Sequence, residues 1–186
     1  YPIRQTRRPL RSHHPHRRNQ RLAHRPLRHV LAVGGLTGVG FGPHPDSGED
    51  LILVTSHQGR GVVNCVTGQR MARDPDPEPA WPDDYTLNCE GIGPLAGTAI
   101  QLSGLLGGGL HTTTTSGWSI DIVTPEWPIE SILLSNQGDP YRDEAGSTWW
   151  HIHREEGCEI RAAGFSPTGH TLAIASSCTL TLFAYS

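Results

Sequence analysis

Lysine is absent from the chain and apolar residues are scarce: all 15 basic side chains are arginine, and hydrophobic residues make up 35% of the 186 positions. No apolar run approaches the roughly 18 residues that a membrane-spanning helix needs, so we expect no membrane span. No Cys-x-x-Cys pair occurs, which excludes a zinc ribbon and a thioredoxin-type motif. A long apolar stripe at helical spacing is also missing, while 22 glycines and 15 prolines interrupt the chain. This composition excludes a helical bundle or coiled coil and favours short strands joined by turns.

Charge divides the chain at about residue 30. The first thirty residues hold nine of the 15 arginines and five of the 11 histidines, and no acidic residue. Residues 31–186 hold the other six arginines and all 18 acidic residues, a net charge of −12. A self-repelling, apolar-poor segment buries too little surface to offset its loss of entropy. We therefore expect a disordered basic tail at 1–30 and a single all-β domain at 31–186.

Three interpretations of the basic tail remain open. An arginine-rich arm neutralises the phosphates of nucleic acid, which predicts salt-dependent binding that ignores sequence. The side chains that would carry this binding lie in two pairs and are Arg7, Arg8, Arg17 and Arg18. The same pairs precede a short apolar stretch at 30–41, as in a targeting segment. Alternatively, the tail is translated upstream DNA of a GC-rich genome, which encodes arginine, histidine and proline in place of lysine, and Val30 fits an alternative start.

Apolar, β-rich runs between turn-forming residues predict strands throughout residues 31–186. The candidate strands are 51–55, 62–66, 69–72, 98–102, 118–123, 131–134, 148–153 and 180–185. Turns at 58–59 and 67–68 join the first three into an antiparallel meander. We expect an all-β fold with antiparallel meanders at 37–73 and 159–185 and at most a turn or two of helix.

The end of the chain repeats a pattern from its beginning. In both places a Phe-x-Pro sequence and a glycine turn precede a buried strand, and a serine-containing turn leads into another strand. The residues of the two copies are Phe41, Pro43, Gly48 and 51–54, and Phe165, Pro167, Gly169 and 172–175. This pattern resembles a strand pair from a blade of a WD-repeat β-propeller, and the 124 residues between the phenylalanines correspond to about three such repeats.

The resemblance to WD-repeat blades implies a propeller, but two features depart from it. The Trp-Asp pair of such a blade is replaced by Val63-Asn64, and no Gly-His opens either copy. Roughly 155 residues also leave room for fewer than the four blades that closure usually needs. We therefore expect a partial or irregular propeller-like sheet array rather than a closed ring. The chain is also similar to small bacterial proteins that end in such a repeat, which implies no function.

Two histidines alternate on the candidate strand at 148–153. If that strand is regular, His151 and His153 point to one face, a spacing that suits two ligands of Zn²⁺. The third ligand would come from His111, Glu155 or Cys158. This pattern supports a metal-dependent enzyme as an alternative function; otherwise the imidazoles simply face solvent.

An acidic, proline-rich stretch at 74–90 carries two aromatic residues among its carboxylates. Aromatic anchors within a polar rim are typical of protein interfaces. The candidate binding residues are Trp81, Asp83, Asp84, Tyr85 and Glu90. Because no coherent set of catalytic residues occurs, we predict a non-catalytic binding module that engages a basic protein, as an inhibitor or immunity-type protein would. The alternative is that the tryptophans only cap the ends of the sheets.

The four cysteines, Cys65, Cys89, Cys158 and Cys178, have no spacing that identifies a pairing. We expect buried, unpaired thiols in a reducing cytoplasm, and no cofactor. Exposed sheet edges would allow copies of the chain to associate.

Overall fold

The computed structural model describes residues 26–184, and nearly all of their regular structure is antiparallel β-strand, which confirms the all-β prediction. The strands are β1 (Leu27–Ala32), β2 (Leu36–Pro43), β3 (Asp50–Ser56), β4 (Gly59–Asn64), β5 (Arg70–Asp74), β6 (Asn88–Glu90), β7 (Ala99–Gln101), β8 (Ser103–Gly104), β9 (Trp118–Glu126), β10 (Ile129–Asn136), β11 (Trp149–Glu155), β12 (Ile160–Phe165), β13 (Thr171–Ser176) and β14 (Thr179–Ala184). Two short 3-10 helices also occur in this range, η2 (Glu78–Ala80) and η3 (Gly93–Leu95).

Strands β2 to β5 form the first predicted meander, in a five-stranded sheet of order β5-β4-β3-β2-β8. Every residue of β3 is buried, as its apolar run predicts. The turn after β4 is fixed locally, because the Asn64 side-chain oxygen accepts hydrogen bonds from the backbone N–H groups of Val66 (2.9 Å) and Thr67 (3.0 Å). Gly68 in the same turn has φ +68°, a conformation that costs glycine little.

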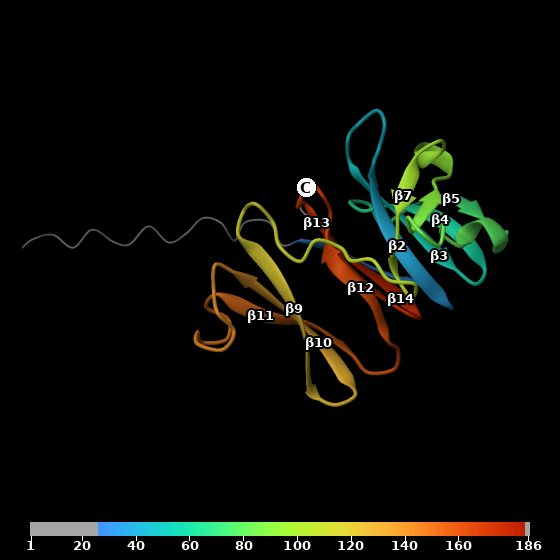
Figure 1. The fold of residues 1–186 in the computed structure, drawn as a ribbon. Helices are drawn as coiled ribbons and strands as arrows, with labels where there is room; N and C mark the ends of the chain where they lie inside the picture. The colour runs from blue at the N-terminus through green and yellow to red at the C-terminus, as the bar shows by residue number, and fades with distance from the viewer. Residues whose placement is uncertain (1–25, 185–186) are drawn as a thin grey trace, which may run out of the picture.

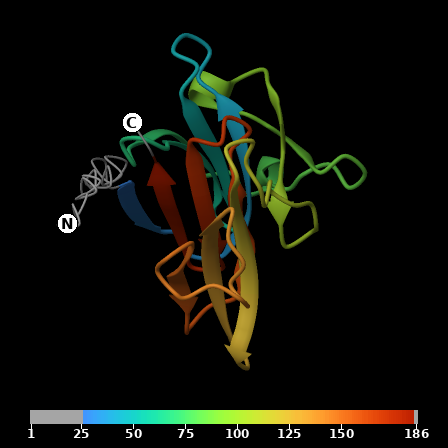
Figure 2. The ribbon, with the colours of Figure 1, turned by 90° about the vertical axis from the view of Figure 1, so that its left-hand side faces the viewer.

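Strands β12 to β14 form the second predicted meander, and β1 completes their sheet in the order β1-β14-β13-β12. The antiparallel pairing of β1 with β14 runs from Leu27 opposite Ala184 to Ala32 opposite Thr179. Figure 2 shows β1, in blue, at the edge of this sheet. We did not expect this strand, which begins inside the segment assigned to the basic tail. Residues 1–25, with Arg7, Arg8, Arg17 and Arg18, lie outside the described residues.

The sheets stack in a row in which β12-β13-β14 lies between its two neighbours (Figure 1). One apolar cluster joins it to the first meander and includes Val39, Ile52, Val54, Ala173, Ala175, Leu180 and Leu182. A second cluster joins its other face to the sheet β11-β10-β9 and includes Ile120, Ile132, Phe165, Leu172 and Ile174. The segment that carries β6 and β7 covers the outer face of the first meander. Within residues 26–184 this row does not close into a ring.

Asp50 joins the two meanders through polar contacts. Its carboxylate is buried at the start of β3 and accepts hydrogen bonds from the hydroxyl groups of Thr168 (2.7 Å) and Thr171 (2.9 Å), at the turn that leads into β13. Burial, with a smaller contribution from Asp50, raises the pKa of the neighbouring Cys65 thiol. A buried carboxylate is tolerated only when its oxygens are hydrogen-bonded, so this contact fixes how the meanders meet.

Candidate functional site

The acidic segment (residues 74–90) is held at both ends by Arg60, a buried side chain on β4. Its Nε lies 3.2 Å from the Asp74 carboxylate, and its Nη1 donates a 2.6 Å hydrogen bond to the Glu90 carbonyl oxygen. The Asp76 backbone N–H and the Arg60 guanidinium hold the pKa of Asp74 below its usual value. Sequence reasoning missed Arg60, because nothing near it in the chain distinguishes it from the other arginines.

Asp83 organises the turn in the middle of the acidic segment. One oxygen of its carboxylate accepts hydrogen bonds from the backbone N–H groups of Thr86 (2.8 Å) and Tyr85 (3.1 Å) and from the Thr86 hydroxyl (2.9 Å). These bonds hold the pKa of Asp83 below its usual value, those from Thr86 contributing most. Asp83, predicted as a binding residue, therefore also shapes the loop that presents its neighbours.

The aromatic residues of the acidic segment face solvent. Tyr85 is 95% exposed, and Trp81 is 44% exposed while its ring contacts His57 edge-on at 5.6 Å between centroids. Asp84 and Glu90 are exposed as well. Trp81 is therefore half-exposed, and part of its ring and the whole of the Tyr85 ring are accessible to a partner.

Other aromatic side chains are exposed at different places. Trp127 is 86% exposed in the turn between β9 and β10, and Tyr141 is 84% exposed in the connection between β10 and β11. The carboxylates near these two rings are partly paired: Glu126 lies 2.8 Å from Arg154, and Asp139 lies 3.4 Å from Arg142.

The two predicted metal-ligating histidines do not share one environment, contrary to the regular alternation that we expected. The pairing of β10 with β11 shifts by one residue, so that Leu133 lies opposite His151 and Ile132 lies opposite His153. Ile132 and Leu133 are neighbours on β10 and point to opposite faces, so the histidines opposite them do too. Ile152, which lies between the histidines, has no partner on β10 and is the extra residue of a β-bulge. His151 is accordingly exposed, whereas the side chain of His153 is 11% exposed.

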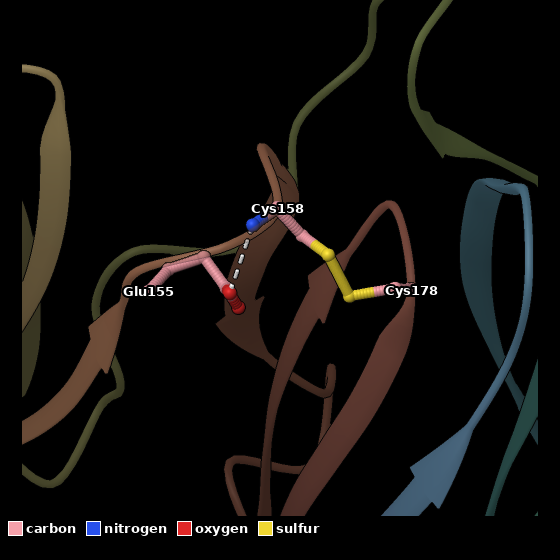
Figure 3. A group of neighbouring side chains, drawn as sticks. All are labelled: Glu155, Cys158 and Cys178. Atoms are coloured by element: carbon pink, nitrogen blue, oxygen red, sulfur yellow. Dashed lines mark hydrogen bonds between the residues drawn. A yellow bond between two sulfur atoms is a disulfide. The ribbon is translucent and has the colours of Figure 1, made fainter.

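His153 instead lies beside Glu155, with 3.4 Å between its Nε2 and the carboxylate Oε2. Glu155 also accepts a 3.2 Å hydrogen bond from the Cys158 backbone N–H. Figure 3 shows this carboxylate next to Cys158 and Cys178. Among residues 26–184, these three are the group whose donor atoms lie close enough together for a metal ion, all within 4.8 Å. His111, the other predicted third ligand, pairs through its backbone with Phe165.

Cys158 and Cys178 form a disulfide bond, so the expectation of four unpaired thiols was wrong for this pair. The bond joins the connection before β12 to the turn between β13 and β14. Cys65 and Cys89 are free and buried as expected, and desolvation raises the pKa of both thiols. Because reactivity requires the thiolate, these two buried cysteines are poor nucleophiles at neutral pH.

No protein-family model matches the chain, and no curated protein is similar to it in sequence. Among the described residues, no helix has the length and apolar character needed to cross a membrane.

Proposed function

We propose that the protein is a non-catalytic binding module and that its acidic segment (residues 74–90) receives a basic protein. The observation that carries this proposal is the exposure of Tyr85 (95%) and Trp81 (44%), four positions apart on a segment clamped at both ends by Arg60. An exposed aromatic side chain buries little apolar surface in the free protein, whereas a ring buried at an interface stabilises the complex strongly.

The order of the acidic segment supports binding. Side-chain oxygens of Asp74, Asp76 and Asp83 each accept hydrogen bonds from backbone N–H groups two or three residues further on. A loop that is held in place before it meets a partner loses little conformational entropy on binding. The segment is thus a prearranged surface rather than a flexible connection.

The charge of the segment sets the expected partner. Exposed carboxylates at Glu78, Asp84 and Glu90 are not among those held in side-chain ion pairs in the described structure. They add to the excess of acidic residues in the domain, which attracts a positively charged protein and speeds its association. An inhibitor or immunity-type protein directed at a basic partner would use such a surface.

We also infer that the scaffold is an open, propeller-like array of blades. Two features support this inference: β2 to β5 form a four-stranded meander, and β1 supplies the fourth strand of the sheet that β12 to β14 begin. Such an array leaves the connections between strands free to vary, and the acidic segment is one of them.

The proposal is tested by comparing exposed aromatic residues. Four proteins are immobilised: wild type, Trp81→Ala, Tyr85→Ala and the control Tyr141→Ala. Basic proteins are captured on them from lysate. One partner identified in this way is then purified and titrated against each of the four. Wild type and Tyr141→Ala should bind it equally, while Trp81→Ala should lose about 2 kcal/mol, roughly 30-fold in Kd. Equal affinity of all four proteins would show that the acidic segment is not the interface.

A further inference from the structure

A pair of cysteines lies next to a glutamate, and near a histidine, at the connections of the middle sheet. Cys158 follows β11, Cys178 lies in the turn between β13 and β14, and Glu155 ends β11. The turn at 155–158 is closed by Glu155 itself, whose Oε1 accepts the Cys158 backbone N–H at 3.2 Å. The carboxylate is thereby fixed beside the two sulfur atoms (Figure 3).

His153 extends this group on the other side of Glu155. The separation of 3.4 Å between His153 Nε2 and Glu155 Oε2 is long for a charge-assisted hydrogen bond, which is usually about 2.7–2.9 Å. It matches the roughly 3.3 Å that separates nitrogen and oxygen ligands placed about 2.0 Å from a tetrahedral zinc ion. Both side chains are only 11% exposed, so the pair is largely shielded from water.

We propose that the reduced protein binds one Zn²⁺ through His153, Glu155, Cys158 and Cys178. Two sulfurs close enough to bond are close enough to share an ion, since sulfur ligands of tetrahedral zinc lie about 3.8 Å apart. Glu155, Cys158 and Cys178 already have donor atoms within 4.8 Å of one another, whereas His153 contacts only Glu155 and must turn toward the sulfur atoms to bind the ion. With this imidazole the set reaches four ligands, the number in a closed structural zinc site.

Reduction of the disulfide by thiol–disulfide exchange makes the two sulfur atoms available as metal ligands. Two molecules of a small thiol reduce the Cys158–Cys178 bond, each giving up one electron and one proton, and leave as one small-molecule disulfide. Zn²⁺ then displaces the protons of both cysteine thiols to solvent and is held by the two thiolates. The chain thus carries one cross-link between the same two turns in either redox state, a disulfide when oxidised and a metal when reduced.

Cobalt and zinc binding to the full chain test this site directly. Protein reduced with a phosphine should bind one Co²⁺ per chain, with the visible absorption of a tetrahedral thiolate complex, and Zn²⁺ should displace it. Oxidised protein should bind none. His153→Gln and Glu155→Gln should each weaken Zn²⁺ binding at least about tenfold, a loss that even outer-shell partners of a metal commonly produce. His151→Gln is the matched control and should bind as wild type does.

Thiol protection provides a measurement that needs no variant. In reduced wild-type protein, Zn²⁺ should slow the alkylation of Cys158 and Cys178, as located by mass spectrometry of the labelled peptides. Unchanged alkylation rates, or no Co²⁺ absorption in the reduced protein, would overturn the site. Equal affinity of wild type, His153→Gln and Glu155→Gln would overturn the four-ligand assignment.

Discussion

The first and the last meander share a strand pattern, but different chemistry anchors them to their surroundings. The first meander (β2 to β5) holds its neighbouring acidic segment through the ion pair and hydrogen bond of Arg60. The last meander (β12 to β14) is anchored by the Cys158–Cys178 disulfide and by the added strand β1. The strands repeat because a buried sheet requires the same apolar run in both places. The specific features of this protein lie in the connections.

Asp50 is the contact that both meanders share, and its removal should have the largest effect on stability. Asp50→Ala leaves the hydroxyl groups of Thr168 and Thr171 without their acceptor and should lower the free energy of unfolding by about 3 kcal/mol or more. Denaturant titration measures the change. Asp46→Ala, at an exposed position in the turn before β3, is the control and should stay within about 0.5 kcal/mol. Similar effects of the two substitutions would mean that Asp50 does not join the meanders.

Loss of the disulfide should weaken the last meander under oxidising conditions only. The bond closes a loop with a sequence separation of 20, for which the chain-entropy estimate is about 3 kcal/mol. Cys158→Ser/Cys178→Ser should therefore unfold at lower denaturant than oxidised wild type. With a reductant and a chelator present, the two proteins should unfold at the same denaturant concentration. A difference that persists under those conditions would mean that the serine side chains, and not the loss of the disulfide, cause the effect.

Arg60→Met should loosen the acidic segment more than the sheet beneath it. The substitution removes the contacts to Asp74 and to the Glu90 carbonyl oxygen while keeping most of the buried stem, at an expected cost of about 1–2 kcal/mol. Hydrogen exchange should become faster at 76–90 and stay unchanged in β3. Uniformly faster exchange would contradict the distinction between clamp and scaffold.

Acid should release the turn at Asp83 with the smallest effect of the series. The pKa of Asp83 is lowered in the folded protein, so the stabilisation is complete above the ordinary value of 3.8 and is lost as pH falls further, through the lowered pKa. The backbone amide signals of Tyr85 and Thr86 should shift in that range. Asp83→Asn should remove the transition, and its persistence in the variant would assign it to another group.

The elements predicted from sequence are those that neighbouring residues determine. Both meanders follow from apolar runs and from turn residues such as Asn64 and Gly68, which act within a few positions. Strand β1 was missed because its partner, β14, lies at the other end of the chain and the arginines around it indicated a tail. No local pattern could have supplied that pairing.

The candidate sites show the same limit. The alternation of His151 and His153 predicted a shared face, but the register of β10 against β11 introduces a bulge between them. Four cysteines allow three full pairings, and sequence spacing cannot choose among them. The acidic segment could be located from its composition, whereas the clamp by Arg60 depends on contacts across about thirty residues of chain.

The proposed function requires that the acidic segment, and not net charge alone, attracts the partner. Two triple variants that remove the same charge separate these possibilities: Glu78→Gln/Asp84→Asn/Glu90→Gln within the segment, and Asp46→Asn/Asp121→Asn/Glu144→Gln at exposed positions elsewhere. The association rate constant of the identified basic partner is measured for both across a range of salt. The segment variant should associate about tenfold more slowly at low salt and lose this difference as salt rises, while the other variant stays near wild type. Equal slowing of both variants would show that net charge alone attracts the partner.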